Sequence, residues 1–287
     1  GENRIFVKAG LRALHKTQNL GLQELIRVQG IEAENVTPYH IGFVLGPCIN
    51  ASGRLDTAEH SLKLLCAKTR EEAAKLAGDL KDLNESRKEL TRQGEAKAIE
   101  LVETSPLQND KVLVVYLPDC HESLAGIIAG RLREHFHKPS FVLTRSEEGV
   151  KGSGRSIPEF HLRDALDLVA KRHPGLIVQF GGHAMAAGLT IKKENLVRFT
   201  KLFDAVTREK CDARTLENRI VVDGPLAADE INFVLIDALE ARIWGQGFDA
   251  PVFANEFTVL NQRVLKGSHL KLFFCLLYTS DAADDLT

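Results

Sequence analysis

The chain has 287 residues, of which 44% are hydrophobic and 26% are charged, a composition ordinary for a globular protein of about two domains. Its formal net charge of −2 means that the chain as a whole does not attract nucleic acid, so any phosphate-binding surface must be a local patch of positive charge. It has no apolar run near the roughly 20 residues that span a bilayer and no C-x-x-C pair, so we expect a reduced, cytoplasmic protein without a membrane segment or zinc site. The chain begins without Met and within an element, so we expect a piece of a longer protein.

Residues 1–105 have the pattern of helices, as in GLQELIRVQ, where apolar residues recur at helical spacing. DTAE at 56–59 predicts a helix start with Asp56 as the N-cap, and TREE at 69–72 predicts another. The second helix continues without proline to about residue 103. Its length and its many Lys and Glu residues favour a connector between two lobes.

After residue 105 the pattern changes to strands that alternate with amphipathic helices, which predicts an α/β domain over roughly 107–245. Residues 252–275 predict two strands that start a separate β unit. Within the α/β domain we expect strands at 111–117, 140–144, 176–180 and at the end of 181–191, and helices at 121–136, 161–173 and 195–210.

The segment GPCINASGRLD, residues 46–56, is expected to form a loop before a helix. One interpretation is a simple turn in which Arg54 pairs with Asp56, and chemistry alone favours it. The other makes Arg54 a phosphate ligand, because a guanidinium can bind two phosphate oxygens at once. His121 lies at a strand-to-helix junction, where a lone histidine more often starts a helix than acts in catalysis.

Residues 151–156, KGSGRS, combine glycine, hydroxyl groups and positive charge as anion sites do. Pro158 stands where a nucleotide-hydrolase phosphate loop would continue into a helix, which excludes that motif. On an extended segment Ser153 and Arg155 share one face, as a phosphate pocket requires, and the glycines would let a ligand approach the backbone. The alternative is a hairpin or an edge-strand turn, and the residues alone do not decide between the two.

The stretch GGHAMAAG begins with Gly181, Gly182 and His183, at the end of a predicted strand. Glycines there cost stability unless something must approach the backbone closely. Helix–sheet packing would explain the alanines but not His183, so we favour a functional site. The sequence has no DxD, no adjacent His-His pair and no HExxH, and we do not expect this chain to perform metal chemistry alone.

Five motifs follow one another along the chain: GPCINASGRLD, HESLAGIIAGRLREHFHKP, GSGRSIPEFHLRDAL, FGGHAMAAGLTI and WGQGFDAPVF. Together they resemble the RecJ family of single-strand-specific 5′→3′ DNA exonucleases, in the Asp-His-His phosphoesterase superfamily. The resemblance departs at Cys120, where family members usually have an aromatic residue. It implies an α/β fold with the end of the catalytic lobe at 1–55, a connecting helical segment at 56–105, an Asp-His-His-associated substrate-binding domain at 106–245 and the start of an OB-type β-barrel at 246–275. Residues 276–287, LLYTSDAADDLT, break the barrel pattern abruptly, so we expect a non-native tail there.

The resemblance implies that the intact protein hydrolyses single-stranded DNA in recombination and repair, with Mn²⁺ or Mg²⁺ held by ligands that precede this chain. The chain alone is then expected to be inactive. The implied partners are single-stranded DNA with a 5′ end, a single-strand-binding protein and a helicase, and no membrane. The implied substrate-binding residues are Arg54, Ser153 and Arg155 for the 5′-terminal phosphate, Gly181, Gly182 and His183 along the same cleft, and Asn50 and His121 as further candidates.

Two alternatives remain. A sister phosphoesterase of short oligonucleotides or nucleotide phosphates would share the GGH domain, but such relatives end after it, whereas this chain continues through WGQGFDAPVF. A non-enzymatic module, such as the related domain of an aminoacyl-tRNA synthetase, would lack the GRLD segment and the long connector.

Overall fold

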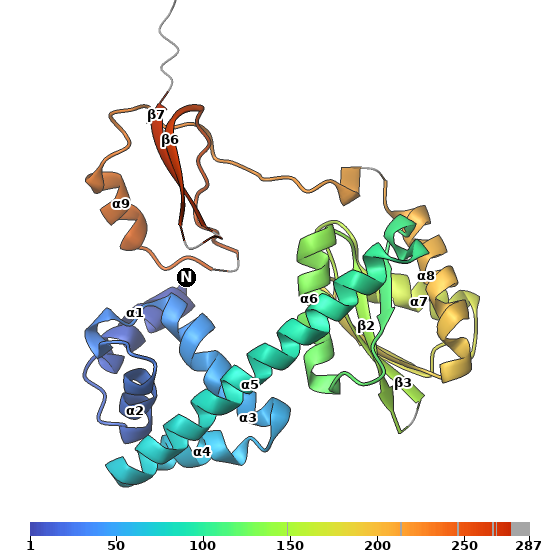
Figure 1. The fold of residues 1–287 in the computed structure, drawn as a ribbon, viewed down its shortest axis with the longest axis horizontal. Coiled ribbons are helices and arrows are strands. Elements are labelled where there is room, and N and C mark those ends of the chain that lie inside the picture. The colour runs from blue at the N-terminus through green and yellow to red at the C-terminus, as the bar shows by residue number, and fades with distance from the viewer. Residues whose placement is uncertain (148, 213, 246, 266, 268, 277–287) are drawn as a thin grey trace, which may run out of the picture. The chain divides into compact units, whose positions relative to one another are not determined.

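The computed structural model describes residues 1–276 except 148, 213, 246, 266 and 268 (Figure 1). The chain forms two compact units, Ala9–Asn218 and a smaller one made of Gly1–Lys8 with the chain from Arg219 onward. Of the tail expected at 276–287, Leu276 ends the last strand, and residues 277–287 lie outside the described residues.

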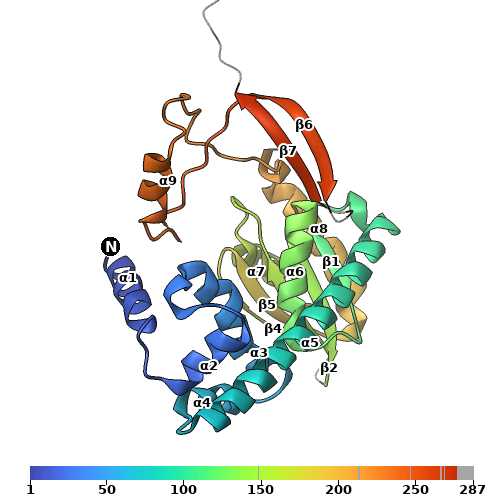
Figure 2. The same cartoon turned by 60° about the vertical axis from the view of Figure 1, so that its left-hand side comes forward.

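Helices make up the first part of the larger unit, and they pack along the N-terminal half of the long helix α5 (Figure 2). Thr69 caps α5 by accepting a hydrogen bond from the Glu72 N–H at 3.2 Å, as the sequence predicts. Leu25, Leu64 and Leu80 are fully buried and join three of these helices. The helices are α2 (Leu20–Val28), α3 (Gly46–Leu55), α4 (Glu59–Cys66) and α5 (Arg70–Glu103), and they follow α1 (Glu2–Leu14), whose residues are divided between the two units.

Two local predictions for this part were wrong. GPCINASGRL is the helix α3 and not a loop, because Pro47 lies in the first turn, where its missing N–H leaves no helical bond unmade. Asp56 does not cap α4, whose N-cap is Ala58 without a side-chain bond. The Asp56 N–H donates to the Ser52 carbonyl at 2.8 Å, so Asp56 ends α3, and the next helix begins later.

The second part of the larger unit is a five-stranded sheet of order β1-β2-β3-β5-β4. Only β1 and β2 are parallel, and every other pair in the sheet is antiparallel. The predicted elements are confirmed except at 176–180, where Leu176 is buried outside the sheet and the strand begins at Gln179. The elements are β1 (Leu113–Tyr116), α6 (Glu122–Phe136), β2 (Ser140–Ser146), β3 (Gly149–Arg155), α7 (Leu162–Arg172), β4 (Gln179–Gly182), β5 (Ala186–Ile191) and α8 (Leu196–Lys210).

The two faces of this sheet are covered differently. One face packs against α7 and α8 through a core that includes Phe141, Phe199 and Phe203. The other face is covered by α6 and the C-terminal half of α5. The strand residues that these helices bury, such as Val115 and Val142, belong to β1 and β2. On this second face β5 and β4 present exposed glycines, so half of the sheet face stays open.

The smaller unit contains α9 (Phe233–Glu240) and a hairpin of β6 (Phe257–Leu265) and β7 (His269–Leu276). The hairpin confirms the two strands predicted at 252–275, whereas α9 was not predicted. Apolar side chains on both strands are exposed, including Leu260 and Phe274. The compact unit starts at Arg219, and the boundary expected at residue 246 stays a prediction.

Candidate functional site

Strand β3 carries Ser153 and Arg155 on one face, and it lies between β2 and β5 in the sheet. KGSGRS is therefore not an edge-strand turn, and most of it lies in the second strand of the β2–β3 hairpin. Gly152 and Gly154, which flank Ser153, face the opposite side. A Cβ on Gly154 would lie 2.5 Å from the Phe141 Cζ, and a Cβ on Gly152 would overlap a methyl group of Leu143. Core packing therefore accounts for both glycines, and approach of a ligand is not needed to explain them.

The side chain of Arg155 extends from β3 and packs against helix α6. A Cβ on Gly126 of that helix would lie 2.7 Å from the Arg155 Nη2, so the glycine leaves the space that the guanidinium occupies. Arg155 Nη1 donates to the Gly154 carbonyl at 2.9 Å. Burial lowers the pKa of Arg155, and the positive charges of Arg54 and Arg133 lower it further. The guanidinium is therefore half-buried among like charges.

Arg54 lies in the last turn of α3 and is tied to the start of α6. Its Nη1 donates to the Ser123 carbonyl at 2.8 Å, and the Ser123 hydroxyl donates to the Arg54 carbonyl at 3.0 Å. Within the described part of the chain Arg54 makes no ion pair, so the expected pairing with Asp56 is absent. These two bonds place Arg54 near Arg155, as the lowered pKa of Arg155 indicates.

Two further arginines join this group, and the sequence analysis missed both. The Nε atoms of Arg87 on α5 and Arg133 on α6 are buried, and neither has a hydrogen-bond partner among the described residues. Burial and the charge of Arg54 lower the pKa of Arg87. Arg54, Arg87, Arg133 and Arg155 form what we call the arginine cluster.

The arginine cluster has little negative charge to balance it. Arg133 pairs with Glu134 at 2.9 Å, and the other three arginines form no ion pair with any residue that the structure describes. A sequence signal for Arg133 exists, because Gly126, Gly130 and Arg133 follow at i, i+4 and i+7 on α6 and share one helix face. Unpaired guanidinium groups gathered in this way favour binding of an anion with several oxygens.

In the GGH segment Gly181 and Gly182 end strand β4, and His183 begins the turn of the β4–β5 hairpin. Gly182 has φ of +139°, and a Cβ there would lie 2.5 Å from the Ala187 Cα, so the turn requires glycine. The His183 N–H donates to the Ala186 carbonyl at 2.8 Å, and its Nδ1 accepts from the Met185 N–H at 3.3 Å. The turn thus gives His183 a structural role that the sequence did not reveal, and its exposed ring keeps Nε2 available.

Asn50 and His121 lie on the same two helices as the cluster. Asn50 is exposed on α3, one turn before Arg54, so both face the same side of that helix. His121 is the N-cap of α6, and its Nδ1 accepts from the Ser123 N–H at 3.3 Å. The interpretation of His121 as a helix-start residue is confirmed.

Metal ligands are the remaining question for this site. The described residues contain no group of three or more His, Cys, Asp or Glu side chains that could hold a metal ion. No helix in the described ranges has the length and apolar character needed to cross a membrane.

Comparisons with known proteins agree on one family. Residues 109–209 match the model of the DHHA1 domain, and residues 222–277 match the RecJ OB domain. The chain is 38% identical over 276 residues to the single-stranded-DNA-specific exonuclease RecJ of Dickeya dadantii and 36% identical to that of Escherichia coli, covering 94% of this chain and 48% of each relative. The chain thus spans about half the length of the curated relatives it matches.

Solved structures give the same result. The crystal structure of RecJ from Thermus thermophilus in complex with Mg²⁺ matches with a TM-score of 0.81 at 27% identity, covering 96% of this chain and 42% of that one. A structure of exonuclease RecJ bound to manganese matches with a TM-score of 0.61 at 30% identity, covering 74% of this chain and 51% of that one.

Proposed function

Because the chain belongs to the RecJ family, we propose that it supplies the DNA-binding side of a single-strand-specific 5′→3′ DNA exonuclease. The observation that carries this proposal is the arginine cluster. Arg54 and Arg155 come from segments about a hundred residues apart and lie close enough for their charges to interact, and Arg155 shares a strand face with the hydroxyl-bearing Ser153. A half-buried group of cations without matching carboxylates is suited to a dianion.

The terminal phosphate of a DNA strand is such a dianion. It carries a charge of about −1.5 to −2 at pH 7, whereas an internal diester carries one charge. Charge-assisted hydrogen bonds from Arg54, Arg155 and Ser153 therefore favour a phosphorylated 5′ end over the middle of a strand. Such a preference orients the strand and sets the polarity of cleavage. Gly181, Gly182, His183, Asn50 and His121 are proposed to line the cleft around this phosphate.

Cleavage itself is assigned to another part of the enzyme. The structures of relatives were solved with Mg²⁺ or Mn²⁺, and we propose the same requirement for the intact protein. No described group of this chain fits such a cation, so the ligands are assigned to the part of the relatives that this chain does not span. The chain alone is expected to release no nucleotides with either metal.

The cellular setting follows from the family alone. We propose action in the cytoplasm, in DNA recombination and repair, with a single-strand-binding protein and a helicase as partners. A phosphoesterase of short oligonucleotides is the second candidate. The match to the RecJ OB domain at 222–277 favours the exonuclease, because a further DNA-binding domain serves a long strand.

Binding measurements test the proposed phosphate site. The purified chain should bind a 5′-phosphorylated single strand more tightly than the same strand with a 5′ hydroxyl. Arg155→Ala should remove most of that preference, a loss of roughly tenfold to a hundredfold for a charge-assisted bond of about 1.5–3 kcal/mol. Arg172→Ala is the matched control, because Arg172 pairs with Glu209 at 2.6 Å. Equal weakening of both strands by Arg155→Ala would show a general backbone contact and refute the proposal.

A further inference from the structure

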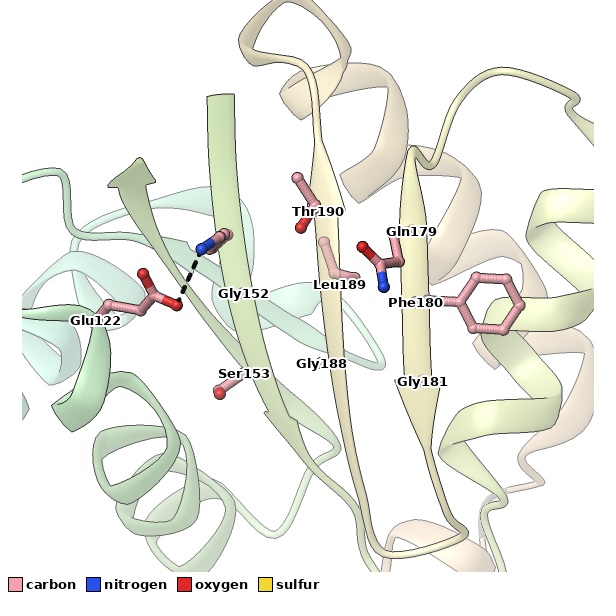
Figure 3. Close-up of a pocket in the computed structure, with 10 residues that line it drawn as sticks. Glu122, Gly152, Ser153, Gln179, Phe180, Gly181, Gly188, Leu189 and Thr190 are labelled. Carbon is pink, nitrogen blue, oxygen red and sulfur yellow. Dashed lines mark ion pairs between the residues drawn. The ribbon is translucent and has the colours of Figure 1, made fainter. Parts of the chain in front are cut away.

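The five-stranded sheet has two edges, which border different sites. The cavity of about 380 Å³ on the side of β4 is lined by Ser153 and Gly181, which the proposed DNA cleft includes (Figure 3). The opposite edge of the sheet is strand β1. A second cavity, of about 490 Å³, borders this strand, and we call it the edge groove.

Two helices that cover opposite faces of the sheet form the walls of the edge groove. One wall is the end of α5 with the 3₁₀ turn Pro106–Asn109, and the other is the N-terminal half of α8. The base consists of three consecutive residues of β1, Val114, Val115 and Tyr116. Because consecutive side chains of a strand point to opposite faces, a cavity that borders all three residues follows the edge of the strand.

The backbone of β1 has unpaired polar groups along this edge. The Leu113 N–H donates to the Pro139 carbonyl at 2.9 Å, and the Leu117 N–H donates to a carbonyl of β2 at 2.8 Å. The backbone groups of Val114 and Tyr116 therefore point away from β2, toward the groove. They have no hydrogen-bond partner among the described residues, although Val114 is only 5% exposed. Buried backbone groups without a partner are rare in folded proteins, because each costs free energy.

The side chains of the edge groove are mainly apolar, with one unmatched charge. Leu101 of α5 and Val197 of α8 line the two walls and are 38% and 66% exposed. Lys201 is the cation of the lining, and it makes no ion pair with any residue that the structure describes. The carboxylate of the lining, Asp110, already pairs with Arg208 at 3.8 Å. The groove therefore suits apolar side chains with a negative charge near Lys201.

We propose that the edge groove binds an extended segment of a partner protein, which joins the sheet as a further strand beside β1. Strand addition of this kind gives the unpaired backbone groups of Val114 and Tyr116 their hydrogen bonds. The edge of a second copy of this chain fits less well, because its own covering helices would meet the walls that α5 and α8 form. A single extended segment carries no such helices. The inference is independent of the arginine cluster and of the DNA cleft.

The walls also define the sequence of the partner segment. Consecutive residues of a strand meet opposite walls, so a short run of apolar residues is required. Val197 and Lys201 are one turn apart on α8, about 6 Å, and strand residues two apart are separated by about 7 Å. An acidic residue should therefore lie two positions from the apolar residue that contacts Val197. The blocked peptide Thr-Asp-Val-Val-Val-Asp-Thr has this pattern in both chain directions.

Binding of this peptide to the purified chain tests the proposal. Fluorescence anisotropy should show saturable binding, and hydrogen exchange of the Val114 and Tyr116 amides, followed by NMR, should slow when the peptide binds. Two N-methylated forms of the peptide, each blocked at alternate amides, separate strand pairing from apolar contact. Only one set of amides faces β1, so one form should lose about tenfold or more in affinity and the other should bind nearly normally.

Variants of α8 test the walls. Val197→Asp should weaken binding at least tenfold, and Val178→Asp is the matched control, because Val178 is 59% exposed and outside the groove. Lys201→Glu should also weaken binding, and a peptide with Lys in place of both Asp residues should recover it. Circular dichroism establishes that each variant is folded, and the N-methylated peptides test the proposal without any variant.

Several results would overturn the proposal. These are no binding at millimolar peptide, equal binding of the two N-methylated forms, or equal effects of Val197→Asp and Val178→Asp. Displacement of the peptide by an oligothymidylate would assign the groove to DNA instead. A dimer of the chain that Val197→Asp dissociates would assign it to a second copy. An intact enzyme that does not bind the peptide would show that the enzyme itself fills the groove.

Discussion

Glycines on the two faces of one sheet are present for opposite reasons. Gly152 and Gly154 of β3 point to the face under α7 and α8, where side chains of Leu143 and Phe141 fill the space that a Cβ would take. Gly188 and Gly181 point to the open face, where that space is empty. The comparison shows that the same residue in the same sheet can serve packing on one face and leave open space on the other.

A single row of paired residues shows how this difference arises. Across the five strands Val115, Val142, Ser153, Gly188 and Gly181 are paired in register on one face. The first two are buried under α6, and the last two are exposed. The row changes from apolar to small where the helix cover ends. Substitutions along these two faces can therefore break or sharpen the comparison.

The largest effect is expected for Gly154→Ala. The added Cβ would lie closer than 3 Å to three atoms of the Phe141 ring, which itself packs edge-on against Phe199 and Phe203. Overpacking of this kind costs roughly 1–3 kcal/mol in the free energy of unfolding. Urea denaturation measures the loss, and a Phe141→Leu change in the same chain should recover part of it. A stable Gly154→Ala variant would mean that this face is not closely packed.

A smaller loss is expected for Gly182→Ala, which tests a third reason for glycine. Gly182 has φ of +139°, which side-chain-bearing residues rarely adopt, and a Cβ would also press on Ala187. We expect a cost of about 1–2 kcal/mol in the free energy of unfolding. Thermal unfolding monitored by circular dichroism checks it. An unchanged midpoint would show that the β4–β5 turn can rearrange without glycine.

Gly126→Ala should change binding more than stability. Alanine in a helix interior adds about 0.5–1 kcal/mol, but the methyl group would lie 2.7 Å from the Arg155 Nη2. The flexible arginine should move, and the preference for a 5′-phosphorylated strand should fall severalfold. Gly130→Ala is the matched control, because its Cβ would lie 4.0 Å from the Arg155 Cγ. If both variants bind alike, the position of Arg155 is not set by α6.

The smallest change in stability is expected for Gly181→Ala. Its Cβ would enter open space, and alanine restricts the unfolded chain more than glycine does. We expect the free energy of unfolding to stay the same or rise by up to about 0.5–1 kcal/mol. Denaturant titration beside the Gly154→Ala variant gives the direct contrast. A clear loss of stability here would remove the distinction between the two faces.

Local patterns in the sequence predicted most of the elements correctly. The long helix with its Thr69 cap depends only on neighbouring residues, and so do the strands at 111–117 and 140–144 and the two strands at 252–275. The shared face of Ser153 and Arg155 follows from the two-residue period of a strand. The two wrong predictions also have local causes. At 46–56 a proline resembles a loop signal, although it suits the first turn of a helix. At 176–180 an apolar run resembles a strand, although it begins buried outside the sheet.

The sequence by itself determined most of the helices and strands and which residues were candidates for binding phosphate, because these depend on short-range spacing and side-chain chemistry. Only the tertiary structure decided which of those residues meet. Ser123 joins Arg54 across 69 positions, and Arg87 and Arg133 enter the arginine cluster from two different helices. The role of each glycine was decided in the same way. Whether a missing side chain leaves room for Phe141 or leaves open space depends on what another part of the chain brings opposite it, and no local pattern records that.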